Sequence, residues 1–216
     1  ALLAPGLCAQ STRLSGPLNA GPSQAGDVRA FTLGADGTWA AYLADQDEAD
    51  VVELWSVPLD GSANSLKLSG TLVTGGDALR GGEPDFRIAP AGERVVYVAD
   101  ADEDETFELF SAPLDGSGPP AKLNDALTGG DVHAFRISAD GSTVVFLADV
   151  SGGGSFDLFA APIDGSTGSL LLASAIASAD SVPFEISGDH THAVYRGTGL
   201  IYSVLLAGSA SPLDLS

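Results

Sequence analysis

Residues 135–165 read FRISADGSTVVFLADVSGGGSFDLFAAPIDG, and this stretch decides the fold. Its short apolar runs are separated by Asp140-Gly141, by a glycine run and by Asp164-Gly165. Asp-Gly and glycine-rich segments accept the positive φ of tight turns, and no window of the chain carries the long 3.6-residue pattern of a helix. The stretch therefore predicts β-strands joined by hairpin turns.

The same pattern occurs four times along the chain, at intervals of 55, 49 and 49 residues. Each unit starts at a phenylalanine: Phe31, Phe86, Phe135 and Phe184. A Pro-Leu/Ile-Asp-Gly turn recurs near the end of the first three units, at Pro58–Gly61, Pro113–Gly116 and Pro162–Gly165. Each unit predicts four short strands, lettered a to d in chain order. A repeat of about 50 residues with four strands falls in the range of β-propeller blades.

The predicted blades are buried on both faces. Strands b and c are apolar throughout, as in Val95–Val98, whereas a sheet with one wet face would alternate. We therefore expect an all-β fold, a single β-propeller domain over residues 11–216 with four four-stranded blades. The units lie near residues 27–76, 77–130, 131–179 and 180–216, with an N-terminal strand at 11–16. The alternative is a partial propeller that completes a larger ring by self-association.

The four units have five candidates for the outer strand d. Thr12–Gly16 resembles the strand-d segment Lys67–Gly70, and Ser211–Asp214 resembles another near the other end of the sequence. One of the two terminal candidates is therefore a spare strand. It either pairs on an outer edge or lies loose, or it completes a blade of another chain and builds oligomers or a filament by strand addition.

The repeat resembles the TolB-type, WD-like propeller repeat. That pattern runs Phe-x-Ser-x-Asp-Gly, Val-Val-Phe, an acidic loop and Glu-Leu-Phe-x-x-Pro-Leu-Asp-Gly, and the match is closest at Phe135–Gly165. The resemblance implies a β-propeller of the exported bacterial type, typically a recognition module. Similar repeats form the propeller half of some peptidases. The fourth unit departs from the pattern, because Gly197–Gly199 replaces the acidic loop.

Charge excludes several classes of partner. Nine Lys and Arg residues against 29 Asp and Glu residues give a net charge of −20, which repels nucleic acid and anionic membranes. No apolar run reaches the roughly 18 residues of a membrane span. We expect no nucleic acid partner and no membrane span, and the predicted partner is another protein or the chain itself, in a homo-oligomer or a polymer.

The first ten residues are predicted to be an N-terminal tail or the remnant of an export segment. The apolar run Ala1–Gln10 looks like the end of an export signal, which favours an extracellular or periplasmic location. Cys8 is the single cysteine, so no internal disulfide forms. Leu7 stands where a lipoprotein signal has a small residue. Cys8 is thus either a buried thiol or a partner in an intermolecular disulfide.

The loops between strands b and c suggest a cation site. Carboxylates alternate in the first two units, at Asp45, Asp47, Asp50, Asp100, Asp102 and Asp104. Alternating carboxylates on a tight loop can converge on Ca²⁺, which accepts several oxygens in irregular geometry. No cofactor is certain, and Ca²⁺ is the candidate. The alternative is a solvated hairpin tip that keeps the sheet edge soluble.

Two further features fall on the same predicted side of the ring. One aspartate precedes strand a in each unit, and together they suggest a ring at the channel mouth: Asp27, Asp77, Asp131 and Asp180. The alternative for each is a turn cap that bonds a nearby backbone N–H. The second unit also contains an insertion at 78–83, a candidate binding loop with Arg80 and Glu83, or else a neutral variation in length.

The sequence contains no credible catalytic set. His190 and His192 fall in a turn without a third ligand, and His133 beside strand a is expected to line the channel or to pack in the core. We therefore expect a non-enzymatic recognition or assembly module that acts through the acidic loop face. One alternative is a structural subunit of an extracellular polymer joined by strand exchange. Another is the detached propeller domain of a peptidase.

Overall fold

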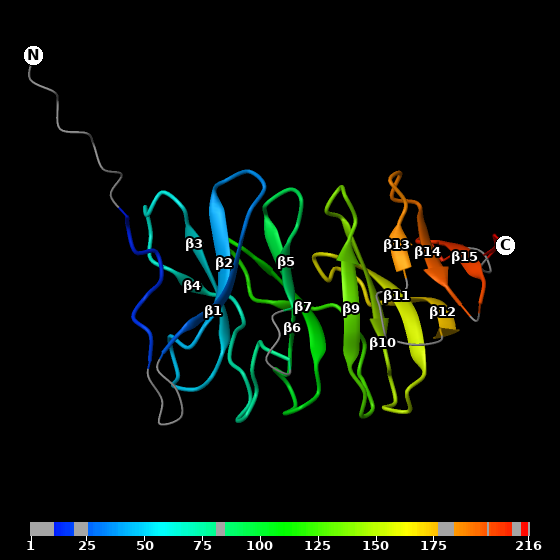
Figure 1. The fold of residues 1–216 in the computed structure, drawn as a ribbon, viewed down its shortest axis with the longest axis horizontal. Helices are drawn as coiled ribbons and strands as arrows, with labels where there is room; N and C mark the ends of the chain where they lie inside the picture. The colour runs from blue at the N-terminus through cyan, green and yellow to red at the C-terminus, as the bar shows by residue number, and fades with distance from the viewer. Residues whose placement is uncertain are drawn as a thin grey trace, which may run out of the picture.

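All regular structure in the computed structural model is β (Figure 1). The structure describes residues 11–19, 26–80, 85–176, 184–197, 199–208 and 213–215. These residues form four antiparallel sheets of four strands each. The predicted all-β fold with four four-stranded blades is confirmed.

Every blade is a meander in which strands adjacent in the chain are adjacent in the sheet. Blade one consists of β1 (Val28–Leu33), β2 (Trp39–Ala44), β3 (Glu53–Pro58) and β4 (Leu66–Lys67). Blade two consists of β5 (Phe86–Ile88), β6 (Arg94–Ala99), β7 (Glu108–Pro113) and β8 (Ala121–Lys122). Blade three consists of β9 (Val132–Ile137), β10 (Thr143–Ala148), β11 (Phe156–Pro162) and β12 (Leu170–Ile176). Blade four consists of β13 (Phe184–Ile186), β14 (His192–Arg196), β15 (Ile201–Leu205) and β16 (Leu213–Asp214).

The turns form as their Asp-Gly sequences predict. In blade three Gly141 has a φ of 74° and Gly165 a φ of 67°, a conformation that costs glycine little. The preceding aspartate fixes each turn from its side chain: Asp140 Oδ1 accepts the Ser142 N–H at 3.1 Å. Such local chemistry repeats in every unit, so the meander is set by short stretches of sequence.

One face of each blade carries an aromatic triplet on strands a, b and c, and we call it the aromatic face. The residues in register are Phe31, Tyr42 and Trp55; Phe86, Tyr97 and Phe110; Phe135, Phe146 and Phe159; and Phe184, Tyr195 and Tyr202. In blades two to four the rings of strands b and c stack at centroid distances of 5.6, 5.3 and 5.4 Å. These cross-strand pairs stabilise each sheet internally.

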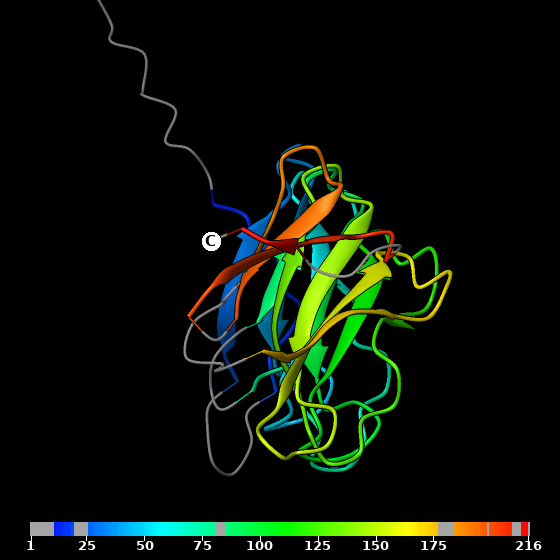
Figure 2. The same ribbon diagram turned by 90° about the vertical axis from the view of Figure 1, so that its right-hand side faces the viewer.

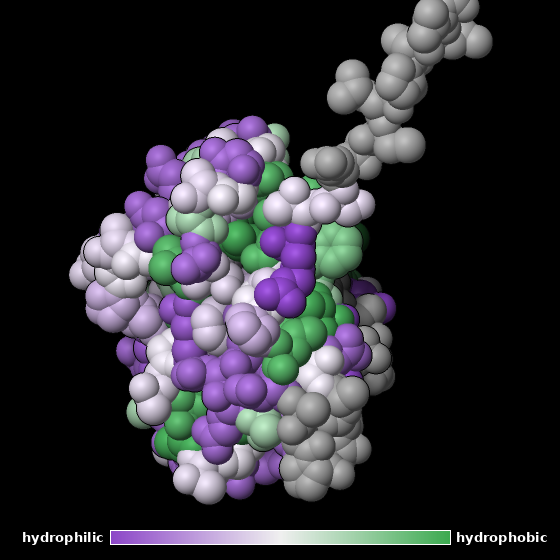
Figure 3. Space-filling model, turned by 90° about the vertical axis from the view of Figure 1, so that its left-hand side faces the viewer, coloured by the Kyte–Doolittle hydropathy of each residue, from purple (hydrophilic) through white to green (hydrophobic). Residues whose placement is uncertain are grey.

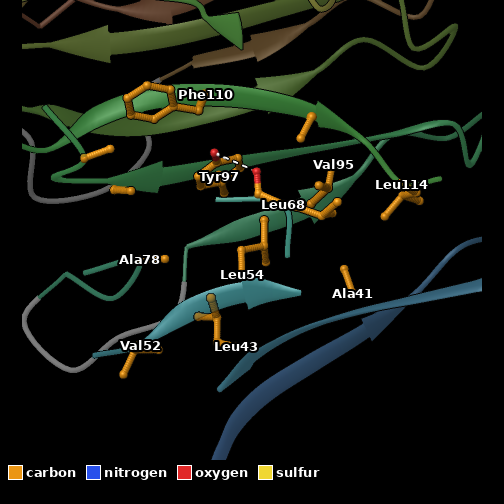
Figure 4. Packing of buried hydrophobic residues seen from close by; sticks show 13 residues of the cluster. Ala41, Leu43, Val52, Leu54, Leu68, Ala78, Val95, Tyr97, Phe110 and Leu114 are labelled. Atoms are coloured by element: carbon orange, nitrogen blue, oxygen red, sulfur yellow. Dashed lines mark hydrogen bonds between the residues drawn. The ribbon is translucent and has the colours of Figure 1, made fainter. Parts of the chain in front are cut away.

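The opposite face is aliphatic in blades one to three, and we call it the aliphatic face. Its fully buried pairs on strands b and c are Leu43 and Leu54, Val98 and Leu109, and Leu147 and Leu158. The aliphatic face of each blade packs against the aromatic face of the next, which produces three separate cores. Figure 4 shows the first, in which Leu43 and Leu54 of blade one lie opposite Tyr97 and Phe110 of blade two.

The four blades lie in an open row. Blades one and four stand at opposite ends in Figure 1, and Figure 2, seen from the blade-four end, shows the sheets one behind another. Each apolar cluster between blades joins consecutive blades, and among the described residues none joins blade four to blade one. Of the two predicted forms, the structure has the partial array. Completion of a larger ring by self-association stays a prediction.

The spare strand d is the N-terminal one. β16 pairs with β15 and completes blade four from the C-terminal side. The predicted strand at 11–16 does not form: these residues are irregular, and Leu14 and Leu18 pack on the aromatic face of blade one. The prediction was wrong because a strand needs a partner backbone, and among the described residues every strand c already has its own strand d as its outer neighbour.

Candidate functional site

The acidic loop of blade one gives its three predicted ligands different environments. Asp45 is fully buried, and its Oδ1 accepts the Asp27 N–H at 2.6 Å. Asp47 instead pairs with Lys67, at 3.0 Å. Asp50 has a positive φ of 63°, so it forms the sharp bend of the loop. The three aspartates of this loop therefore have different structural roles: a buried hydrogen-bond acceptor, an ion-pair partner and a bend in the backbone.

The loop of blade two repeats this arrangement. Asp100 is buried, and its Oδ1 and Oδ2 accept the N–H groups of Asp77 at 2.5 Å and Glu105 at 3.0 Å. Asp102 pairs with Lys122 at 2.9 Å. The Asp104 carboxylate lies against Gly75, where an added Cβ would meet its Oδ1 at 2.7 Å. Its loop thus packs on the connection between blades one and two.

These partners leave no convergent set of ligands. Within the described ranges, no three His, Cys, Asp or Glu side chains come close enough together to hold a metal ion. The geometry therefore gives no support to a calcium site formed by three loop carboxylates. Calcium binding by the six loop aspartates stays a prediction. Among them, Asp45 has a buried Oδ2 without a hydrogen-bond partner among the described residues.

The two lysines of the chain neutralise buried glutamates. Lys67 Nζ donates to Glu53 Oε1 at 2.5 Å, and Lys122 Nζ lies 2.5 Å from Glu108 Oε1. Both glutamates are almost fully buried on strand c. Partial burial opposes the charge of Lys67, but its hydrogen bonds to Glu53 and Asp47 outweigh that effect and raise the pKa of Lys67. Each acidic loop is thereby tied to the outer edge of its own blade.

Two of the four aspartates predicted at the channel mouth are instead clamps between blades, Asp77 and Asp131. Asp77 Oδ1 accepts the Val52 N–H of blade one at 3.2 Å, and Asp131 Oδ1 accepts the Phe107 N–H of blade two at 2.9 Å. Neither the predicted ring nor the alternative of a local turn cap agrees with the structure. The row of blades is open, and the N–H partner of each aspartate lies 25 or 24 residues away, in the preceding blade. Asp27, in the first of the described blades, lies 3.9 Å from Arg29, and its side chain is 62% exposed. Asp180 lies outside the described residues.

The clamp at Asp77 carries a titratable charge. Burial raises the pKa of Asp77 to about 6, and the neighbouring charge of Asp100 adds to the effect against the hydrogen bond from Val52. A raised carboxyl pKa in the folded state contributes stability below the unfolded value of 3.8, and this contribution is lost as the pH rises through about 6.

We expect Asp77→Asn to raise the melting temperature at pH 7.5 and to have almost no effect at pH 4. Asparagine keeps the oxygen that accepts the Val52 N–H but removes the charge, and because the site is half-buried the gain is about 1 kcal/mol. Thermal melting from pH 4 to pH 8 measures the difference. In Asp140, hydrogen bonds from Ser138 and Ser142 lower the pKa to about 2, so Asp140→Asn should not stabilise the protein at pH 7.5. A gain from both variants would contradict the assignment.

The insertion that suggested a binding loop is partly structural. Arg80 donates to the backbone oxygens of Val132 and His133 on β9, the latter at 2.9 Å, and so ties the connection before blade two to blade three. Glu83, its predicted companion, lies outside the described residues. His133 packs edge-on against Phe156 at 4.6 Å, which matches the packed alternative. The Arg80 guanidinium is thus engaged by the fold rather than presented to a ligand. Cys8 also lies outside the described residues.

A groove of about 850 Å³ crosses blades one to three at their a–b and c–d turns. Trp39 and Arg94 line it together with turn aspartates, and none of these was a predicted site residue. The Arg94 Nε donates to Ser111 Oγ at 2.9 Å, and Asp36 and Asp115 hold their own turns through Thr38 and Ser117. The polar groups of the groove are therefore already used by the turns.

The surfaces that sequence reasoning missed are the two ends of the row. The N-end face is the aromatic face of blade one. Leu14 and Leu18 cover part of it, so that Tyr42 is only 4% exposed. Phe31 stays 72% exposed there, whereas its equivalents Phe135 and Phe184 are each 2% exposed. Figure 3 looks at this end and shows hydrophobic side chains gathered beside hydrophilic ones. Phe31 matches the other phenylalanines in sequence, so its exposure follows only from its place at the end of the row.

The C-end face is the outward face of blade four. Arg196 and Ile201 pair there across strands b and c, at the positions of the buried Leu43 and Leu54. Ile201 is 52% exposed, and Leu213 and Leu215 beside it are exposed as well. Arg196 was the available signal in the sequence, because the other three units have a leucine or a valine at its position.

Neither a protein-family model nor a curated protein matches this sequence. Solved structures do. A protein from Agrobacterium tumefaciens described as TolB aligns with 92% of this chain and 68% of its own, at 16% identity and a TM-score of 0.49. An oligogalacturonate lyase, solved in complex with manganese, aligns with 86% of this chain at 12% identity and a TM-score of 0.53. The likeness to the lyase supports a β-propeller fold for this chain.

The chain spans about half of the lyase, 52% of that chain. At 12% identity the likeness carries the fold alone, so the lyase activity and the manganese belong to that protein. Within the described residues there is no helix that could cross a bilayer.

Proposed function

We propose that this β-propeller is a non-enzymatic assembly module that joins its partner through the two end faces of its row of blades. The observation that carries the proposal is the exposure of Phe31. Fully burying a phenylalanine stabilises a contact by roughly 1.5–3 kcal/mol, and a blade is built to be covered on both sides. An exposed apolar patch with a polar rim is typical of a protein interaction surface.

A second candidate is recognition of a positively charged partner through the acidic loops of blades one and two. Asp47 and Asp102 favour it, because their carboxylates stay largely exposed even though each is paired with a lysine. Binding through these loops would weaken steeply as salt rises, whereas apolar contact at the end faces would not. Salt dependence therefore distinguishes the two surfaces. We also include an exported location, extracellular or periplasmic, in the proposal, on the export-like sequence of residues 1–10.

The test is sedimentation of the whole chain over a wide concentration range. We expect the average mass to rise with concentration, and Phe31→Lys to keep the protein at the mass of a single chain, because a charge then stands at the centre of the N-end face. Leu171→Lys is the matched control, since Leu171 is also exposed but lies on β12, on the outer edge of blade three. A single-chain mass for the unmodified protein at every concentration, or dissociation by the control, would refute assembly through the end faces.

A further inference from the structure

The three junctions inside the chain share one polarity. Each joins the aliphatic face of a blade to the aromatic face of the following blade. The chain ends with one face of each kind, an aromatic N-end face and a C-end face with aliphatic side chains. We propose that copies of this chain join head to tail, with the N-end face of one copy covering the C-end face of the next; the inference rests on the proposed assembly function and names a second copy as the partner.

The N-end face already carries the connecting segment that an internal junction needs. In the first two of the three internal junctions the chain crosses between blades with two leucines four residues apart, Leu68 and Leu72 and then Leu123 and Leu127. Leu14 and Leu18 have the same spacing and pack on the aromatic face of blade one in the same way. The segment therefore lies where the connection between two blades lies in an internal junction. It covers Tyr42 and Val57, and what the junction lacks is an aliphatic cover over Phe31.

The C-end face supplies a surface of that kind. Ile201 stands at the position of Leu54, which packs in the same cluster as Phe86, the equivalent of Phe31. Leu213 and Leu215 enlarge the apolar area beside Ile201. A head-to-tail contact would therefore place Phe31 against Ile201 as the internal junction places Phe86 near Leu54.

Charges at the two faces are complementary. Inside the chain each clamp aspartate accepts an N–H at the start of the preceding strand c. Blade four cannot offer that donor, because the Gly199 N–H is bonded to the Gly197 oxygen in its short turn. Arg196 lies at the end of β14, three residues before Gly199 and opposite Ile201, and its side chain is long. Its guanidinium can reach the carboxylate of Asp27 in the neighbouring copy, which Arg29 of that copy already approaches at 3.9 Å.

This polarity fixes the possible assemblies. A head-to-tail contact is heterologous, so it yields a closed ring if the rotation between copies closes and a filament if it does not. Two copies in a ring would contain eight blades. Contact between two N-end faces, by contrast, would stop at a dimer.

Mixing two face variants tests the polarity. Phe31→Lys blocks the N-end face, and Ile201→Glu blocks the C-end face by placing a carboxylate near Asp27. Both side chains are exposed in the single chain, so melting temperatures should stay unchanged. We expect each variant alone to sediment as one chain and the equimolar mixture to form a complex of two chains and no larger species. In the control mixture, the Leu171→Lys variant takes the place of the Phe31→Lys variant, and we expect complexes of more than two chains.

Cysteine cross-linking covers the case in which one junction alone is too weak to sediment. In a Cys8→Ser background, Phe31→Cys and Ile201→Cys should be linked by a bismaleimide only when mixed. Linkage of Phe31→Cys to itself, or no linkage in the mixture while the unmodified chain assembles, would overturn the head-to-tail contact and leave the proposed function standing. A single-chain mass for the unmodified protein would remove both.

Discussion

Replacing Lys67 with methionine should lower the free energy of unfolding by about 3 kcal/mol, the lower end of the range for breaking a buried ion pair. Glu53 is 1% exposed, and Lys67 Nζ is bonded to it at 2.5 Å. Methionine keeps the packing of the aliphatic stem but leaves the glutamate charge buried without a cation. Lys122→Met should have a similar effect through Glu108, since the geometry of the second pair is the same. Urea unfolding at pH 7 measures both.

Partner variants separate this charge effect from lost packing. Lys67→Arg keeps the cation and should cost less than Lys67→Met. Glu53→Gln combined with Lys67→Met removes both charges and should recover most of the loss, because the glutamine still bonds the Asp47 N–H that Glu53 Oε2 now accepts at 3.0 Å. Equal losses in the single methionine variant and in the double variant would contradict a role for the buried charge.

The strands and turns of the blades could be predicted from the sequence because they are determined by residues close together in the chain. Asp-Gly turns such as Asp140-Gly141 are fixed by neighbouring residues. The phenylalanine that starts each unit, first at Phe31, recurs along the sequence and gives the number of units. The strands consequently fall inside the predicted units, and the fold and its resemblance to TolB-like propellers were predicted correctly. The predicted strand at 11–16 failed because pairing needs a partner strand, which local sequence does not reveal.

The contacts at the candidate site could not be predicted as well, because they join residues that are far apart in the sequence. Asp77 bonds Val52 in another blade, and the choice depends on how blades stack rather than on its own turn. The carboxylates of one loop were expected to converge, but cross-strand register gives Lys67 to both Asp47 and Glu53. A sequence repeat predicts the contacts that all units share. It does not predict which contacts differ between a unit inside the row of blades and a unit at its end.

Phe31 and Phe135 occupy equivalent positions of the repeat, one at the end of the row of blades and one inside it, so the cost of removing each ring can be compared. We expect Phe135→Ala to lower the free energy of unfolding by about 3–5 kcal/mol, the range for removing a buried phenylalanine. Phe135 is 2% exposed within the core between blades two and three, whereas Phe31 is 72% exposed. Phe31→Ala should therefore cost less than about 0.5 kcal/mol in the single chain.

The difference between the two variants should depend on assembly. At concentrations where the protein is a single chain, urea unfolding should show the loss for Phe135→Ala alone. Where copies associate, the N-end face is covered and Phe31→Ala should become destabilising as well, since binding to the folded state adds to its apparent stability. Phe135→Ala should be costly at every concentration. Equal losses from both variants in the single chain would mean that Phe31 is already covered, and the N-end face would then offer no surface for a second copy.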